Sequence, residues 1–432
     1  MRTLIKGGRL VDPSTRNAKV GNLLIEGQHI KSHPKSTERL EADGKTKVID
    51  AGGLVVAPGL VDLHATLGEP GFEHKETILT GSAAAAAGGF TSVVVMPNTI
   101  PVNDNAAVTE YILFKARTKG AIKIFPLGAL SKGLEGESLA DIGEMREAGC
   151  VGITDNGRPT RSSKVMRLAL EYAKGFDITV FLDCHDPELT SGGMMNEGYT
   201  SMILGLRGIP STAEEMFVAR NIALAELTGA RIHVCHVSTA ASVRLIREVK
   251  KRGVTLTCDT APHFFTLTEE AVINYDTHTK TFPPLRTDED VDSVKEGLRD
   301  GTIDAIASCH APHTEDEMKV EFDLAPFGIS SLETTFSFSL ALVRDGVLSL
   351  SKLIEKLSTA PAVIIGQPKG SLKVGSVADI VVFDEDESFK VETRGFLSKG
   401  KNCPFDGLEA KGRVKYTLVE GKQVFGPAER TS

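Results

Sequence analysis

Short apolar runs rich in β-branched residues alternate with longer segments of helical pattern through the middle of the chain. In 213–228 and 239–252, apolar residues recur at the spacing of one helix face. Alternation of strand and helix, eight times in succession, predicts a (β/α)8 TIM-like barrel, since parallel strands are joined by crossover helices. The predicted strands are 54–64, 91–96, 122–127, 151–154, 178–184, 231–236, 254–260 and 303–309.

One predicted helix is marked by composition as well as spacing. Segment 75–87 ends in five consecutive alanines, which favour a helix interior, and the two glycines at 88 and 89 favour its termination. The chain has no G-x-G-x-x-G turn, which a doubly wound dinucleotide-binding sheet would need. The pattern therefore favours the barrel over an open α/β sheet.

The two ends of the chain have a different pattern from the middle. Segments 3–25, 380–383 and 414–424 show strand-like runs bounded by turn residues. They predict a small β-sandwich domain built from both ends, with the barrel inserted between them. The expected boundaries are 1–53 and 366–432 for the two parts of the β-domain and 54–365 for the barrel.

Composition limits the possible functions. The 432 residues are 41% hydrophobic and 25% charged, which is ordinary for a globular protein. A net charge of −8 with no basic run longer than a few residues argues against nucleic acid or an anionic membrane surface as a partner. No apolar stretch approaches the ~18 residues of a membrane span, and the first residues lack a signal-peptide pattern. A cytoplasmic location is expected.

The six cysteines are scattered without paired spacing. This pattern disfavours a disulfide framework or a zinc knuckle. Cys184, Cys235 and Cys258 are predicted to be small core residues.

In a barrel of this kind the chemistry lies at the carboxyl ends of the strands. His263 and His310 also follow predicted strands, and we expect both to be buried and hydrogen-bonded. The other polar residues in such positions are His64, Thr66, Asn98, Asp155, Asn156, Asp183, His185, His236, Cys309 and His313.

Several strings of residues at or near these positions are those of a known family. The chain resembles the cyclic amidohydrolases, and within them the dihydroorotases, over nearly its whole length. The strings that carry the resemblance are PGLVDLH (58–64), MPNT (96–99), PPLR (283–286), HAPH (310–313), APFG (325–328) and LSKGKNCPF (397–405).

The resemblance implies a zinc site at the strand ends, but four of its six ligand positions have changed. His64 and His236 stand where the family has histidines. Thr66 replaces a histidine, Asn156 replaces an acidic residue or modified lysine, and Asp183 replaces a histidine. The amide of Asn156 cannot bridge two metal ions as a carboxylate does. The neighbouring Asp155 is expected to point to the other side of its strand.

The fourth change falls on the general acid/base of the family. An aspartate on the last strand takes and returns the proton, and Cys309 stands there. Loss of such a base commonly costs about 10²–10⁴ in rate. The donors His64, Asp183, His236 and Cys309 could hold a single zinc in a closed, structural site, so the expected cofactor is none or one zinc. A catalytic thiolate at Cys309 would need His64 or His236 as its base.

Two of the four substrate-binding residues of the family are replaced in this chain. Gly68 stands where an arginine would clamp the substrate carboxylate, and Phe282 replaces an asparagine. Asn98 and His313 remain as substrate-binding remnants. Without a bidentate arginine the strongest orienting contact to a carboxylate is absent.

These changes predict a non-catalytic dihydroorotase-like protein of pyrimidine biosynthesis. Some bacterial aspartate carbamoyltransferases need an inactive dihydroorotase-like chain to assemble, and the resemblance implies that enzyme as a partner, in an oligomeric complex. The alternative is a divergent mononuclear-metal cyclic amidohydrolase of the dihydroorotase, hydantoinase or allantoinase type. An ordinary dihydroorotase would require too many simultaneous exceptions.

Overall fold

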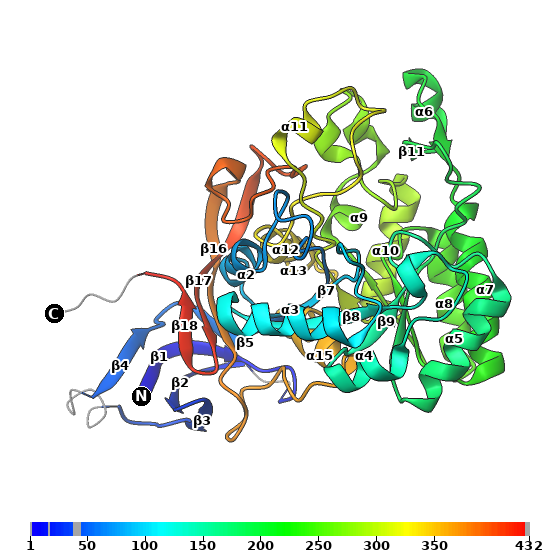
Figure 1. Cartoon of the computed structure of the whole chain (residues 1–432). Helices are drawn as coiled ribbons and strands as arrows, with labels where there is room; N and C mark the ends of the chain where they lie inside the picture. The colour runs from blue at the N-terminus through cyan, green and yellow to red at the C-terminus, as the bar shows by residue number, and fades with distance from the viewer. Residues whose placement is uncertain (1, 16–17, 38–44, 428–432) are drawn as a thin grey trace.

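A computed structural model describes residues 2–15, 18–37 and 45–427 of the chain. A barrel of alternating strands and helices fills most of the molecule, and the two ends of the chain lie together on one side of it (Figure 1). The predicted (β/α)8 barrel with a terminal β-domain is confirmed. Among the described residues, no helix is both long and apolar enough to span a bilayer.

Eight parallel strands make the barrel wall, each paired with its neighbour in chain order. The wall is joined between its first and last strands where Thr66 N–H donates to the His310 carbonyl at 2.7 Å. Each of the eight predicted runs overlaps one of these strands, and five of the runs contain the whole strand. The strands are β6 (Leu60–Ala65), β7 (Phe90–Val95), β8 (Lys123–Ala129), β9 (Gly152–Thr154), β10 (Thr179–Asp183), β13 (Ile232–Cys235), β14 (Leu256–Thr260) and β15 (Ala305–Ile306).

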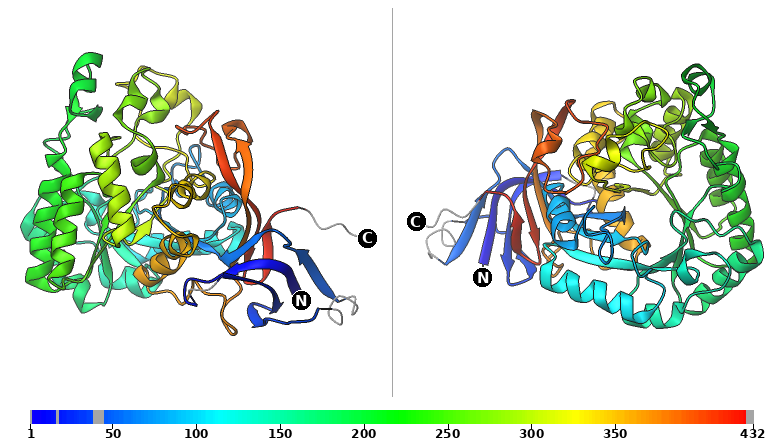
Figure 2. Two further views of the ribbon diagram at one scale, coloured as in Figure 1. Left: turned by 180° about the vertical axis from the view of Figure 1, so that it is seen from behind. Right: turned by 45° about the horizontal axis from the view of Figure 1, so that its top comes forward.

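Helices surround the barrel and bury one apolar face each against it (Figure 2). The first, α2 (Ile78–Ala87), begins after the capping residue Thr77 and ends at Gly88. A Cβ at Gly88 would collide with the Leu332 carbonyl oxygen, so the helix end needs a glycine. The other helices of the barrel are α3 (Ala106–Lys119), α4 (Ile142–Ala148), α5 (Ser163–Gly175), α7 (Thr212–Thr228), α8 (Ala240–Lys251), α10 (Asp288–Asp300), α12 (Thr335–Ser339), α13 (Ala341–Arg344), α14 (Leu350–Ile354) and α15 (Ala360–Ile364).

The terminal β-domain is an eight-stranded sheet with its own apolar core. Its first part contributes β1 (Arg2–Val11), β2 (Ala18–Glu26), β3 (His29–Ser32), β4 (Thr46–Asp50) and β5 (Val55–Pro58), and its second part β16 (Ile380–Lys390), β17 (Glu409–Val419) and β18 (Lys422–Phe425). The two parts meet where β5 pairs antiparallel with β16. The run 54–64 is therefore two strands, and the sheet extends past the expected boundary at residue 53.

Further short elements lie over the carboxyl ends of the barrel strands. A small parallel pair, β11 (Met195–Asn196) and β12 (Gly208–Ile209), carries α6 (Tyr199–Leu204) between its strands. Figure 1 shows α6 standing outside the rest of the barrel. The remaining helices on this face are α9 (Pro262–Thr266) and α11 (Glu315–Met318).

Candidate functional site

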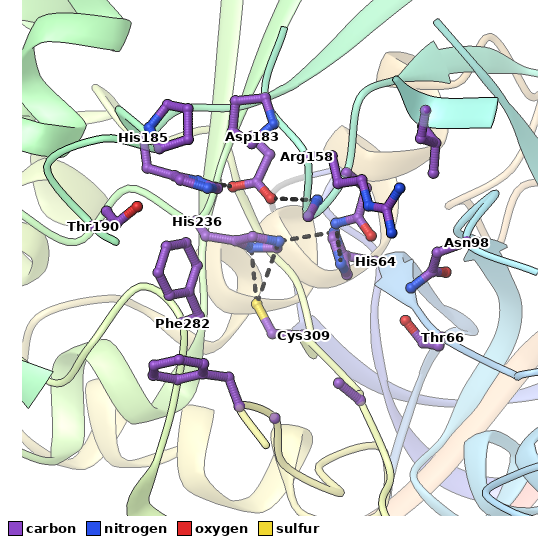
Figure 3. A pocket seen from close by; sticks show the side chains of 18 of the residues that line it. His64, Thr66, Asn98, Arg158, Asp183, His185, Thr190, His236, Phe282 and Cys309 are labelled. Carbon is purple, nitrogen blue, oxygen red and sulfur yellow. Dashed lines mark hydrogen bonds and ion pairs between the residues drawn. The ribbon is translucent and has the colours of Figure 1, made fainter. Parts of the chain in front are cut away.

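A cavity of about 1050 Å³ opens at the carboxyl ends of the barrel strands. Its floor is formed by polar side chains from different strands, and Phe282 and Phe327 form part of its wall (Figure 3). Because parallel strands bring their carboxyl ends to one rim, residues distant in sequence meet here. Of the ligand positions implied by the resemblance, all six line the cavity: His64, Thr66, Asn156, Asp183, His236 and Cys309.

The two histidines and the cysteine form one hydrogen-bonded chain across the floor. Nδ1 of His64 and Nε2 of His236 lie 2.8 Å apart, and Nδ1 of His236 lies 2.8 Å from the Cys309 sulfur. On the far side, the Asn156 amide nitrogen lies 3.2 Å from Nε2 of His64. Both ring nitrogens of each histidine thus already have protein neighbours.

A buried carboxylate behind His236 sets the charge of this chain. Asp259 lies on β14 and accepts the backbone N–H of His236 at 2.7 Å, with its Oδ1 3.3 Å from Nδ1 of that histidine. Burial alone would lower the pKa of His236, but Cys309 and Asp259 outweigh burial and raise that pKa. Burial and the neighbouring His236 lower the pKa of His64 to about 3. These opposite directions favour protonation of His236 over protonation of His64.

Burial of the Cys309 thiol disfavours its thiolate form. Burial raises its pKa to about 11, although His236 acts in the opposite direction. Cys309 and His236 both adopt left-handed backbone conformations, with φ of 55° and 57°. Such conformations are uncommon for residues other than glycine, so the turns after β13 and β15 hold both side chains over the cavity.

Asp183 faces the same cavity but is engaged elsewhere. Its Oδ2 accepts the Gly157 N–H at 2.8 Å, and its Oδ1 lies 3.3 Å from Nδ1 of His185. Burial acts to raise the pKa of Asp183, yet His185 outweighs burial and the pKa is lowered. Asp155, by contrast, does not line the cavity, as the alternation along its strand predicts.

The four predicted zinc donors do not form a compact ligand set in this geometry. Among the described residues, one group of His, Cys, Asp or Glu has ligand atoms all within 4.8 Å of one another, and it is His233, Cys235 and Asp259. In that group His233 already contacts Thr257 and Asp259 through its two nitrogens, at 2.8 and 2.9 Å. In this structure the ligand atoms of His64, Asp183, His236 and Cys309 are therefore not close enough together to form the predicted closed site. Zinc binding by these residues stays a prediction.

The two predicted substrate-binding remnants have different positions. Asn98 lines the cavity, whereas His313 does not. Nε2 of His313 contacts the Phe327 carbonyl at 2.9 Å, and its Nδ1 contacts Lys75 at 3.2 Å. Its imidazole holds two loops together outside the cavity, because these nearby polar groups occupy both of its nitrogens.

The structure also shows what surrounds Gly68 and Phe282, the two residues that replace substrate-binding side chains of the family. Gly68 has φ of +65°, and a Cβ there would lie 2.8 Å from the Phe72 carbonyl oxygen. No arginine fits at residue 68 without movement of this loop. Phe282 packs edge-on against His185 and Phe327, with ring centroids 4.4 and 5.3 Å apart, and makes that wall of the cavity aromatic.

Of the two histidines expected to be hydrogen-bonded, one is not. His263 lines the cavity, is 2% exposed, and its buried Nδ1 has no hydrogen-bond partner among the described residues. Burial lowers its pKa to about 3, so the ring is neutral. His310 accepts the Ser331 N–H through Nδ1, and its Nε2 lies 3.5 Å from Glu76. The expectation is thus wrong for Nδ1 of His263, and Nε2 of His310 also has no hydrogen-bond partner among the described residues.

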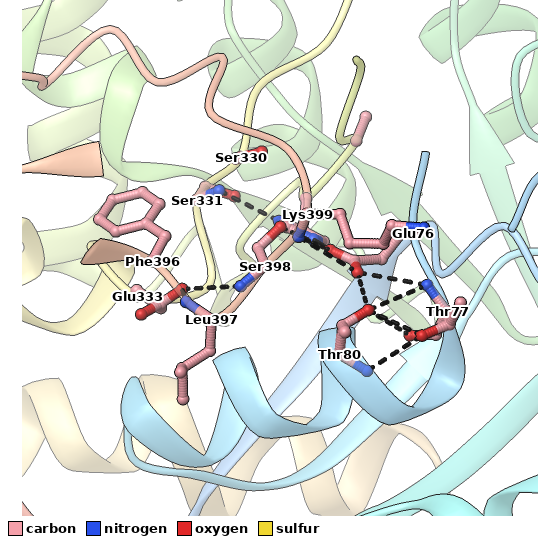
Figure 4. A network of polar contacts seen from close by, with 12 residues as sticks. Glu76, Thr77, Thr80, Ser330, Ser331, Glu333, Phe396, Leu397, Ser398 and Lys399 are labelled. Carbon is pink, nitrogen blue, oxygen red and sulfur yellow. Dashed lines mark hydrogen bonds and ion pairs between the residues drawn. The ribbon is translucent and has the colours of Figure 1, made fainter. Parts of the chain in front are cut away.

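A strap from the end of the chain supports one side of the cavity. The buried Glu76 accepts the Ser398 hydroxyl at 2.5 Å and the Lys399 N–H at 3.3 Å (Figure 4). Further along, Asn402 Nδ2 donates to the Gly328 carbonyl at 2.8 Å, and Gly328 lines the cavity. The string 397–405 therefore ties the loops after β15 to the top of the barrel.

Asp259 and Arg286 are buried charged residues that support this region and that the sequence did not single out. Asp259 lies near the carboxyl end of β14. A charged residue at the end of a predicted barrel strand could have been recognised in the sequence as a candidate site residue. Arg286 was visible only as the last letter of the PPLR string, and its partners come from other parts of the chain.

Comparisons with known proteins agree with this architecture. The family model described as "Dihydro-orotase-like" matches residues 53–242, and that of the amidohydrolase family matches residues 339–425. A dihydroorotase of Geobacter metallireducens is 50% identical over 425 residues, covering 98% of this chain and 100% of that protein. One of Syntrophus aciditrophicus is 48% identical, covering 98% and 99%.

Solved structures of similar fold are named as dihydropyrimidinases and hydantoinases. Dihydropyrimidinase of Brevibacillus agri superposes with a TM-score of 0.85 at 26% identity, covering 99% of this chain and 95% of its own. L-Hydantoinase of Arthrobacter aurescens superposes with a TM-score of 0.88 at 25% identity, covering 99% and 96%.

Proposed function

Because the chain belongs to the dihydroorotase family of cyclic amidohydrolases, we propose that it is a non-catalytic member of that family. In this proposal it acts in the cytoplasm, in pyrimidine biosynthesis, as a structural partner of aspartate carbamoyltransferase in an oligomeric complex. Fold and function are separable, since a barrel can be retained for its surfaces after its site has changed.

The observation that carries the proposal is the state of Cys309. It stands at the carboxyl end of the last barrel strand, where the family has its general acid/base. A catalytic acid/base works best with a pKa near the operating pH, and burial raises the pKa of this thiol to about 11. The sulfur is also held 2.8 Å from Nδ1 of His236.

A second feature supports the loss of substrate binding. The backbone of Gly68 leaves no room for the Cβ of an arginine, so the carboxylate clamp cannot be regained by a side-chain change alone. The imidazoles of His64 and His236 are instead paired with each other and with Asn156 and Cys309, which stabilises this part of the cavity without a substrate.

The test is a dihydroorotase assay in the hydrolytic direction on the purified chain with added zinc. A dihydroorotase about 50% identical to this chain serves as the positive control. We expect no turnover above background. Turnover within tenfold of the control would contradict the proposal and would show that these residues support the reaction.

The partnership is tested separately by mixing the chain with aspartate carbamoyltransferase from the same organism. Sedimentation velocity is expected to show one larger complex of fixed stoichiometry. Two independently sedimenting species would contradict the assembly role, whatever the activity assay shows.

A second candidate is a divergent mononuclear-metal amidohydrolase acting on a hydantoin, an allantoin or a similar cyclic amide. The retained cavity of about 1050 Å³ and the overlap with dihydropyrimidinase and L-hydantoinase favour it. It predicts metal-dependent hydrolysis of such rings. Loss of that activity on chelation and its return with zinc would favour this candidate over the non-catalytic one.

A further inference from the structure

Three segments form a separate unit, here called the cap, over the carboxyl face of the barrel: 187–210, 267–280 and 314–326. One residue from each, Met195, Val272 and Phe322, packs into a shared apolar cluster. The Tyr275 hydroxyl donates to the Leu204 carbonyl at 2.8 Å and so joins the first two segments. The cap therefore behaves as one body rather than as three independent loops.

Buried polar contacts fix the cap to the barrel. Arg286, which is 3% exposed, donates to Asn196 at 2.8 Å, and Asn196 donates to Glu269 at 2.5 Å. Thr200, within α6, donates to Glu269 at 2.6 Å. Buried charges are tolerated only with well-placed partners, so this network holds α6 in one position. A surface fixed in advance loses less entropy when it binds.

Part of the outer surface of the cap, on α6 and the segment beside it, is apolar. Tyr199, Met202 and Ile203 share one face of α6, and Ile273 and Tyr275 belong to the neighbouring segment. Each of these five side chains is between 47% and 73% exposed. Both views in Figure 2 show α6 projecting away from the barrel. Clustered exposed apolar side chains mark interaction surfaces, whereas single ones do not.

Charge restricts what this surface can bind. The three segments contain ten acidic and three basic residues, a net −7, while the whole chain has a net charge of −8. Two copies of the cap facing each other would repel, as would nucleic acid or an anionic membrane. A protein surface with an apolar centre edged by lysine and arginine is complementary to the cap.

We propose that the cap is the docking surface for the partner protein, and that the partner presents such a basic-edged apolar patch. This inference rests on the proposed assembly function and adds the surface through which assembly occurs. The apolar face of α6 supplies the buried centre of the contact, and the exposed acidic residues of the three segments orient the approaching partner.

The experiment compares two triple variants and a matched control for binding to aspartate carbamoyltransferase. The apolar variant is Tyr199→Ser, Met202→Ser and Ile203→Ser. The charge variant is Glu270→Lys, Asp276→Lys and Glu321→Lys. The control, Leu168→Ser with Tyr172→Ser, removes apolar side chains of 44% and 51% exposure from α5, outside the cap. Circular dichroism and melting temperature verify that each variant is folded.

We expect the apolar variant to raise the Kd at least ~100-fold. The charge variant should mainly slow association and reduce its dependence on salt. The control should bind within about twofold of the unmodified chain. Because the charge variant alters only exposed side chains, it keeps the test decisive if the apolar variant fails to fold.

The outcomes separate this inference from the function on which it rests. If the unmodified chain does not bind the carbamoyltransferase, the assembly function and the docking surface both fall. If it binds and both cap variants bind equally well, only the docking surface is overturned. Self-association of the unmodified chain that the apolar variant abolishes would assign the cap to a second copy and also overturn it.

Discussion

The sulfur of Cys309 lies 2.8 Å from Nδ1 of His236, which belongs to a strand two places away in the barrel wall. This contact occupies a position where the family resemblance implies a carboxylate facing a metal ion. Together with the His64 contact it leaves His236 with both nitrogens engaged. The two histidines of the floor are thus satisfied by contacts with neighbouring side chains.

The first prediction concerns the effect of removing metal ions on stability. Dialysis against a chelator is expected to leave the melting temperature unchanged, because the donor atoms are already paired with one another. A zinc ion present at 100 times its Kd would instead add about 2.7 kcal/mol to the stability of the folded state. Scanning calorimetry with and without added zinc measures the difference, and elemental analysis of the purified chain gives the metal content. A clear drop on chelation, reversed by zinc, would contradict the prediction.

Arg286 is predicted to be one of the costliest residues to remove. Arg286→Met should lower the free energy of unfolding by about 3–5 kcal/mol, because it leaves Glu214 and Asn196 buried without their partner. Arg299→Met is the control, since Arg299 pairs with Glu296 on the surface, where such pairs contribute about 0–1 kcal/mol. Urea unfolding measures both. Equal losses from the two substitutions would show that the buried network contributes no special stability.

Glu333 is predicted to make stability depend on pH near neutrality. Burial raises its pKa to about 7, although the Leu397 and Ser398 N–H groups donate to it. Its unfolded pKa is near 4.5, so its contribution to stability is fully present below pH 4.5 and is lost as the pH rises through 7.

The glutamine variant isolates this contribution. Glu333→Gln keeps an oxygen that accepts both N–H groups but cannot ionise. At pH 8 it should be more stable than the unmodified chain by on the order of 2 kcal/mol, and the two should converge at pH 4. Urea unfolding across this range tests the sign. The same change at the exposed Glu110 is the control, and a constant difference at all pH values would contradict the assignment.

Asn402 is predicted to hold the cavity wall through the strap. Its Nδ2 donates to the Ala311 and Gly328 carbonyls, and its Oδ1 accepts from His313 N–H and the Ser330 hydroxyl. Asn402→Ala leaves these groups without a partner, at a cost of about 1–3 kcal/mol each where they stay buried. Hydrogen exchange should accelerate in 310–313 and 325–330. Exchange in α5 should not change, and a uniform acceleration would indicate global destabilisation instead.

The sequence by itself determined the barrel and the residues at its active face. Strand and helix patterns are local properties, and alternation along each strand decides which side chains face the same way. That was enough to place His64, Asp183, His236 and Cys309 together in one cavity and Asp155 outside it.

Only the tertiary structure decided which partners these side chains find. Hydrogen bonds join residues far apart in sequence, such as His64 and His236, and turn direction after a strand is not a periodic signal. For that reason His313 faces away from the cavity, Nδ1 of His263 is left without a partner, and residues 55–58 join the terminal sheet. Exposure of the cap likewise depends on what the fold leaves uncovered, since the same apolar residues in a core would have an identical local pattern.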